Sequence, residues 1–118
     1  MSASPTYVLS IERAKASLQD IISALSMPDH ATRLTEAKNN AGNDMMMYMQ
    51  LVFPLATQIQ QDVIQNYGFP ADREGLLEFT RIIKMLAKEN EEIAQMDEDL
   101  RSLLIPSMVL TYPQTNTN

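Results

Sequence analysis

The sequence predicts an all-α protein, and three observations lead to that prediction. The chain has 118 residues, with only three Gly and three Phe, no Trp and nine Met. Methionine and leucine lose little rotamer freedom in a helix, whereas the β-branched and aromatic residues that favour strands are thinly spread. Apolar residues recur at spacings of three and four, the period of one helix face. We expect a four-helix bundle organised around one long, Pro-kinked central helix.

The chain is long enough for one domain and too short for a second core of ordinary size. We expect a flexible N-terminal lead over residues 1–9, a helical bundle over residues 10–105 and a Pro-containing, partly disordered tail over residues 106–118. The first helix should begin after Ser10, whose hydroxyl can accept from a first-turn N–H, and run to about Ser26. Its apolar face consists of Ile11, Ala14, Leu18, Ile21, Ile22 and Leu25.

The strongest apolar pattern predicts the central helix, over residues 29–67. Nine positions recur at a mean spacing of about 3.6 residues, the period of an α-helix. Two helices broken at Asn39–Asn43 are the alternative, because Gly and Asn lower helix propensity. Pro54 cannot donate to the carbonyl of Gln50 and predicts a kink there. The nine positions are Leu34, Ala37, Ala41, Met45, Tyr48, Val52, Leu55, Ile59 and Val63.

Two shorter helices should follow. Gly68 can adopt the left-handed conformation after the central helix, and Pro70 prevents its continuation. Asp72 is the expected N-cap of a third helix and Asn90 that of a fourth, which Pro106 ends. The apolar register also passes through residue 90, so these two helices could be continuous. Met108, Val109, Leu110 and Tyr112 of the tail could pack as an extended strap over the bundle.

Charge and cysteine content exclude several classes of protein. The net charge of −6 repels phosphate backbones and anionic lipid, so we expect neither nucleic acid nor membrane as a partner. The chain has no Cys, which removes thiol catalysis and zinc–thiolate sites. The most apolar segment, Met45–Ile59, is too short and too polar to span a bilayer. With no visible signal peptide, the expected location is cytoplasmic, with the nucleus as a second compartment.

No pattern in the sequence predicts catalysis, a cofactor or a metal. His30 is the only histidine and should be a surface residue, because a lone His specifies neither a triad nor a metal site. The carboxylates Asp97, Glu98 and Asp99 are adjacent, so on a helix they point to different sides and cannot converge on one ion. The three glycines are isolated, and no phosphate-binding loop is present.

The run Met45-Met46-Met47, continued by Met49, is the most unusual local feature. Three consecutive helical positions cannot all face one core. Either the methionines pack against several helices, or Met46 and Met47 face a partner, for which the adaptable thioether side chain is well suited. A second apolar line, Met49, Phe53, Ala56 and Ile64, indicates either a central helix or an oligomer interface. The candidate partner surface is Met46, Met47, Gln50, Gln58 and Gln61.

Several segments of the chain form a recognisable set: Asn43–Met45, the run Pro54–Ile64, Tyr67–Phe69, Glu92–Ala94 and Leu103–Pro106. In these segments the chain resembles the protein C-ten family of small intracellular animal proteins. The resemblance implies a non-enzymatic, largely cytoplasmic protein that acts through partners in development or signalling, since the vertebrate member is linked to development of the brain and corpus callosum. Relatives differ in their tails, and the family has no established catalytic residues to carry over.

Together, these observations predict a non-enzymatic, regulatory protein–protein interaction protein with a protein partner. One alternative is a structural subunit, stable only as a homodimer or within a larger assembly. Another is a small-molecule-binding or enzymatic bundle, which a deep enclosed pocket with convergent polar groups would favour.

Overall fold

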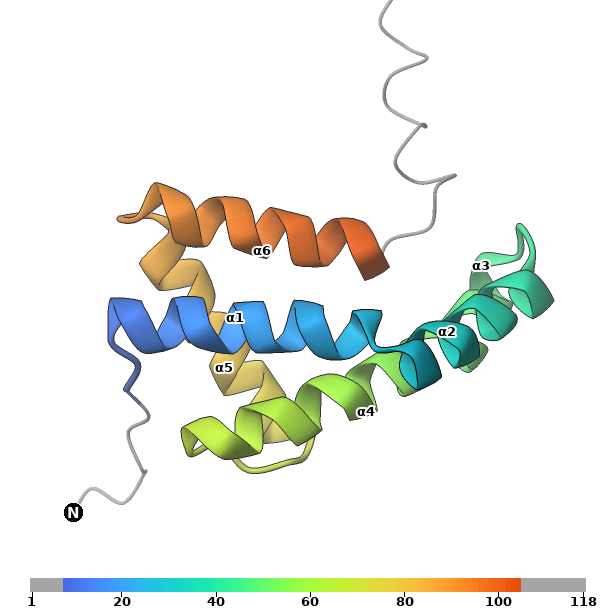
Figure 1. Ribbon diagram of the computed structural model, residues 1–118, viewed down its shortest axis with the longest axis horizontal. Coiled ribbons are helices and arrows are strands. Elements are labelled where there is room, and N and C mark those ends of the chain that lie inside the picture. Colours follow the sequence, from blue (N-terminus) through green and yellow to red (C-terminus); the bar gives the residue numbers. More distant parts are fainter. Residues whose placement is uncertain (1–7, 105–118) are drawn as a thin grey trace, which may run out of the picture.

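A computed structural model describes residues 8–104 of the chain, and this part is helical almost throughout (Figure 1). It contains six α-helices, one short 3-10 helix and no strand, so the predicted all-α class is confirmed. The elements are α1 (Ile11–Ser26), α2 (Pro28–Ala41), α3 (Met45–Leu51), α4 (Phe53–Ile64), η1 (Gln65–Tyr67), α5 (Arg73–Ala87) and α6 (Glu91–Leu104).

Helix α1 lies at the centre of the bundle. It begins as predicted, because the Ser10 hydroxyl accepts a hydrogen bond from the backbone N–H of Arg13 at 3.1 Å. It contacts α2, α4 and α6, and in Figure 1 it runs between α6 and α4. Its side chains Ala14, Leu18 and Ile21 are completely buried, as the apolar spacing requires.

The single helix predicted over residues 29–67 is wrong, because this stretch forms α2, α3, α4 and η1 as separate elements. The alternative break near Asn39–Asn43 is the correct one. Gly42 adopts a positive φ of 59°, which ends α2, and the carboxylate of Asp44 accepts from the backbone N–H groups of Met46 and Met47 to begin α3. The chain reverses here, and α2 and α3 lie side by side in Figure 1. The regular apolar spacing persists across a turn because both helices face the same core.

The sequence predicted a helix kink at Pro54, and the structure has a junction between α3 and α4 at Val52, two residues earlier. Pro54 stands in the first turn of α4, where its missing N–H leaves no bond unmade. Val52 keeps helical dihedral angles and donates from its backbone N–H to the carbonyl of Tyr48 at 2.9 Å. Helices α3 and α4 therefore follow one another directly, with Val52 as the single residue between them.

The remaining helices begin where the sequence predicts. The Asp72 carboxylate accepts from the N–H of Gly75 at 2.8 Å, and the Asn90 side chain accepts from the N–H of Ile93 at 3.0 Å. The second cap separates α5 from α6, so the continuous alternative is wrong. Phe69, after the left-handed Gly68, packs edge-on against Phe79 of α5 with ring centroids 5.5 Å apart.

The packed region extends slightly beyond its predicted start. Leu9, which the sequence placed in the N-terminal lead, is buried in the core. At the other end, the structure describes the chain to Leu104, so the tail over residues 106–118 and its predicted strap lie outside the described residues.

An ion pair between Lys15 of α1 and Glu92 of α6 joins these two helices at the surface. The hydrogen bond and the charge of Lys15 lower the pKa of the Glu92 carboxyl.

Candidate interaction surface

Helix α3 is short and buries only one of its seven side chains, Tyr48. The Tyr48 hydroxyl donates a hydrogen bond to the backbone carbonyl of Leu104 in the last turn of α6. Burial of the ring raises the pKa of this phenol, because the charged form would lose hydration. One aromatic anchor thus holds α3 on the bundle, and the rest of the helix faces outward.

The outward side of α3 is apolar. Within residues 8–104, six of the eleven exposed large hydrophobic side chains belong to α3 or to the first residue of α4. Met46 is 67% exposed and Met49 is 52% exposed. Positions 46, 49 and 53 follow the i, i+3, i+7 spacing of one helix face. We call the six residues the methionine surface; they are Met45, Met46, Met47, Met49, Leu51 and Phe53.

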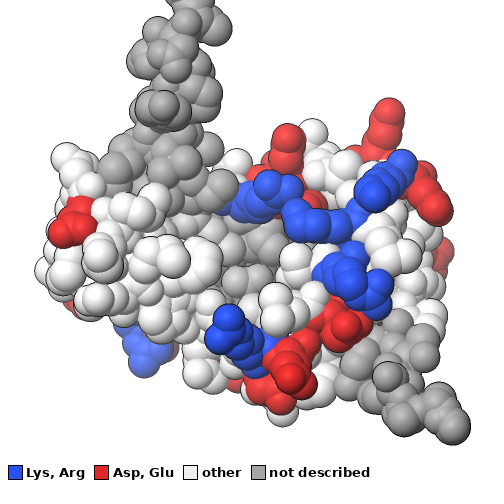
Figure 2. Space-filling model, turned by 180° about the vertical axis from the view of Figure 1, so that it is seen from behind, with Lys and Arg blue, Asp and Glu red and all other residues white. Residues whose placement is uncertain are grey.

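The methionine surface also lacks charge. No Asp, Glu, Lys or Arg occurs from Met45 to Gln61, a run bounded by Asp44 and Asp62. In Figure 2 the end of the molecule formed by α2 and α3, at the left, is mostly uncharged, whereas acidic and basic side chains gather on the other half. A concentration of exposed apolar side chains on a small protein is typical of an interaction site.

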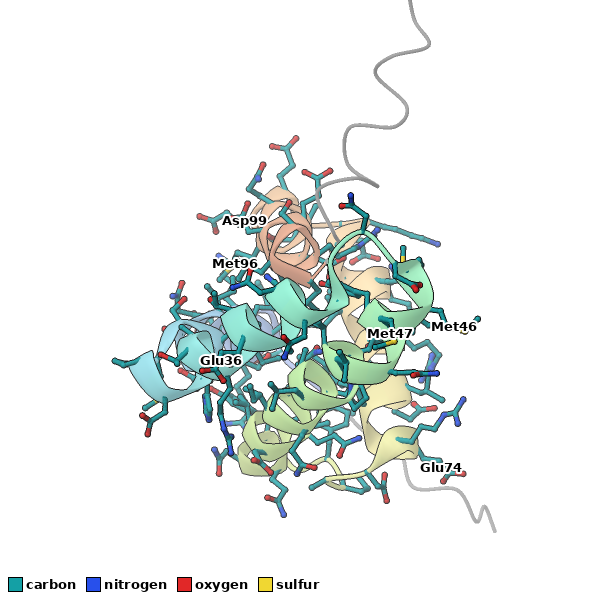
Figure 3. All side chains as sticks on the ribbon, turned by 90° about the vertical axis from the view of Figure 1, so that its right-hand side faces the viewer. Glu36, Met46, Met47, Glu74, Met96 and Asp99 are labelled. Carbon is teal, nitrogen blue, oxygen red and sulfur yellow. The ribbon has the colours of Figure 1, made fainter. Side chains whose placement is uncertain are left out.

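The structure brings part of the predicted surface together. Met46, Met47 and Gln50 all lie on α3, and all three are exposed; Figure 3 labels the two methionines at this end of the molecule. Gln58 and Gln61 lie on α4, beyond the junction at Val52, twelve and fifteen residues after Met46. The Gln58 side-chain amide donates to Asp62 at 3.5 Å, and Gln61 is only partly exposed. These two glutamines therefore belong to a separate, polar part of α4.

For three members of the methionine surface, the sequence predicted a buried position. Met45 was placed on the buried stripe, and Met49 and Phe53 on a second line that a central helix would bury; the structure leaves all three exposed. Ala56 and Ile64 of that second line are buried. The signal that could have separated them is Asp44, whose N-capping side chain starts a new helix directly before the methionine run.

A polar cluster joins α1 to η1 on another part of the molecule. The Tyr67 hydroxyl donates to the Asp20 carboxylate at 2.5 Å, and the Arg13 guanidinium stacks 4.9 Å from the Tyr67 ring centroid. Burial of the ring, the hydrogen bond and the charge of Asp20 raise the pKa of Tyr67 to about 12, against the opposing effect of Arg13. Tyr67 contacts both Asp20 and Arg13 of α1, so the cluster fixes η1 to α1.

His30 is half-buried in the first turn of α2, where the sequence predicted a surface position. One of its ring nitrogens, Nδ1, lies 2.7 Å from the carbonyl oxygen of Ala24. This carbonyl lies in the last turn of α1, where backbone carbonyl groups have few hydrogen-bond partners within the helix. His30 therefore joins α1 to α2.

A hollow of about 620 Å³ is an open groove along α6 that includes Glu91, Asp97, Glu98 and Arg101. Over residues 8–104, no three His, Asp or Glu side chains are grouped so that they could hold a metal ion. The same residues include no helix with the length and apolar character needed to cross a membrane.

Comparison with known proteins places the whole bundle in one family. The family model described as "Protein C10" matches residues 10–118. The mouse relative named "Protein C10" is 47% identical over 109 residues, which cover 92% of this chain and 86% of the relative. The zebrafish (Danio rerio) relative of that name is 44% identical over 110 residues, covering 92% and 90%. The human one is 47% identical over 102 residues, covering 86% and 81%.

No solved structure matches the chain significantly. The family model covers all six α-helices and the residues of the methionine surface, and the mouse relative is 47% identical over 92% of this chain. The resemblance inferred from the sequence segments is confirmed, and the chain belongs to the Protein C10 family.

Proposed function

We propose that this chain is a non-enzymatic, regulatory interaction protein that binds a protein partner through the methionine surface. One observation supports the proposal most directly: α3 buries only Tyr48, and the short segment from Met45 to Phe53 carries six of the eleven exposed large hydrophobic side chains of residues 8–104. Exposure of this much apolar surface to water is unfavourable, and a bound partner would relieve it.

The chemistry of the surface defines the kind of partner that would fit. Four of its six members are methionines, whose flexible, polarisable side chains adapt to partners of different shape. Gln50 supplies an uncharged polar group beside Met46, one helical turn away. An apolar centre with a polar rim is the ordinary anatomy of a protein interface. The partner should therefore present an apolar, uncharged face, such as one side of an amphipathic helix.

The family resemblance adds biological context to this proposal. It supports a role in development, including that of the brain, or in signalling, in the cytoplasm and with access to the nucleus. Extracts of developing brain are therefore the appropriate source of partners. The proposal includes no cofactor, nucleic acid or membrane.

The test compares two double variants of equal charge. Met46→Asp with Met47→Asp changes the methionine surface, and Leu77→Asp with Met85→Asp changes two α5 side chains that are 61% and 53% exposed. Affinity capture followed by mass spectrometry should yield proteins that bind the wild type and the α5 control but not the α3 variant. Titration of one such purified partner should show at least about 100-fold weaker binding by the α3 variant, since each buried Met contributes about 1.5–3 kcal/mol.

The outcome that overturns the proposal is equal partner binding by both double variants, with helical circular dichroism intact. A homodimer or structural subunit is the second candidate, because an uncharged surface carries no like charges to repel a second copy. Sedimentation of the wild type at several concentrations distinguishes the two candidates. A concentration-dependent dimer that the α3 substitutions abolish supports the second candidate.

A further inference from the structure

The end of the described chain lies directly beside α3. The carbonyl of Leu104, the last described residue, accepts a hydrogen bond from Tyr48, the one buried side chain of α3. The carbonyl of its neighbour Leu103 accepts from the Lys38 ammonium of α2 at 3.2 Å. Two adjacent carbonyls of α6 are thus attached to the α2–α3 pair, and the described chain ends next to this pair.

The segment that follows Leu104 has the composition of an apolar strap. Residues 105–112 read Ile-Pro-Ser-Met-Val-Leu-Thr-Tyr, and no charged residue occurs after Arg101. In an extended chain alternate side chains point to the same side, so Met108, Leu110 and Tyr112 would form one apolar face. Eight extended residues reach about 26 Å, whereas the seven residues of α3 span about 10 Å. The segment is long enough to cross the whole helix.

We infer that residues 105–112 of this same chain pack across the methionine surface of α3. An exposed apolar helix and an apolar segment tethered beside it reduce their contact with water by associating. The tether also gives the segment an effective concentration in the millimolar range, which a free partner seldom attains. A second copy would bring two acidic chains, each of net charge −6, into contact. These three points favour the chain's own segment as the occupant.

This inference extends the proposed function without depending on it. A protein partner that binds the methionine surface would have to displace residues 105–112, so the segment would lower the apparent affinity for that partner. The docking itself requires no partner, and it can be measured in the isolated chain.

The experiment uses the absence of native cysteine. Thr111→Cys provides a single site for a nitroxide spin label, on the opposite side of an extended segment from Leu110 and Tyr112. The full-length chain is labelled with ¹³C at its methionine methyl groups and observed by NMR. The methyl signals of Met46 and Met49 should broaden strongly, whereas that of Met85, an equally exposed methionine on α5, should not. Broadening centred on Met27 would place the segment along α2 and overturn the inference.

Two controls separate docking from tethering and from self-association. Leu110→Asp with Tyr112→Asp, in the spin-labelled chain, should remove the broadening at Met46 and Met49 while the helical circular dichroism stays unchanged. Broadening that persists would mean that proximity alone causes it, and the inference fails. A mixture of spin-labelled, unenriched chains with enriched, unlabelled chains should show no broadening; strong broadening there would assign the surface to a second copy. No protein partner is present in these experiments, so their results test the docking of residues 105–112 and not the proposed binding of a partner.

Discussion

Tyr48 and Leu104, 56 residues apart in the sequence, are joined by a hydrogen bond from the phenol hydroxyl to the backbone carbonyl. The bond fixes the short helix α3 to the last turn of α6. Helix ends leave carbonyl groups without partners inside the helix, so Tyr48 satisfies a group of α6 and anchors α3 at the same time.

Substitution of Tyr48→Phe should therefore loosen α3 without unfolding the bundle. The ring stays buried, and one hydrogen bond is lost, which should lower the free energy of unfolding by about 1 kcal/mol. Urea unfolding followed by circular dichroism measures the change, and amide hydrogen exchange in α3 should quicken more than exchange in α1. A variant as stable and as well protected as the wild type would contradict the anchoring role.

The N-cap of α3 gives a second prediction. Asp44 accepts hydrogen bonds from the N–H groups of Met46 and Met47, so Asp44→Ala should destabilise the chain by about 1 kcal/mol. Asn caps helices about as well as Asp, and Asp44→Asn should retain most of the stability. Equal losses in the two variants, measured by denaturant unfolding, would show that the carboxylate charge matters and not the cap.

The first turn of α5 approaches the loop before it so closely that only glycine fits. A Cβ atom at position 75 would lie 1.9 Å from the carbonyl oxygen of Pro70. Ala is ordinarily better than Gly in a helix by about 1 kcal/mol, yet Gly75→Ala should destabilise the chain by about 2 kcal/mol or more, because backbone atoms must move. Thr80→Ala, at an exposed position of the same helix, is the matched control and should change the stability by less than about 0.5 kcal/mol. Thermal unfolding of both variants decides the sign.

Stability should also fall at alkaline pH through Tyr67. The pKa of this phenol is raised from 10.0 to about 12 in the folded chain, so the neutral form is favoured by folding. Its contribution is complete below pH 10, where the unfolded phenol begins to ionise, and is lost as the pH rises toward 12. Burial is the largest cause and Asp20 the next.

Substitution of Asp20→Asn should accordingly lower the pKa of Tyr67 toward its ordinary value. The ultraviolet absorbance of tyrosinate follows this titration, and Tyr67→Phe identifies the signal by removing it. Glu36→Gln, a change of the same charge on α2, should leave the titration curve in place. A curve that is the same in Asp20→Asn and the wild type would contradict the role of the hydrogen bond between Tyr67 and Asp20.

The sequence predicted the parts of the fold that local chemistry determines. Ser10, Asp72 and Asn90 cap helices where they were expected to, because a side chain that reaches a backbone N–H three residues away needs no information from the rest of the chain. The apolar face of α1 was also correct: four of its six members are buried in the core, and Ile11 and Ile22 are partly buried against it. Family membership followed from the run of residues in α4 and its flanks.

The prediction of one long helix over residues 29–67 was wrong because the spacing of apolar residues does not show whether the chain continues or reverses its direction. Leu34 and Tyr48 are in phase in the sequence, and both are buried, although Gly42 and Asp44 turn the chain between them. A pattern of spacings reads the same whether a helix continues or folds back, provided that both parts face one core. The exposure of Met46 and Met47 was predicted because consecutive helical residues cannot share a face. Met45, Met49 and Phe53 were assigned to buried lines because the N-cap Asp44 was not recognised as the start of a new helix.

The central position of α1 has a consequence for synthesis on the ribosome. Helix α1 packs against α6, which is translated last of the described helices. Until α6 has been made, a nascent chain exposes the side of α1 that α6 covers in the folded protein. This interval is when cellular chaperones would have most to bind.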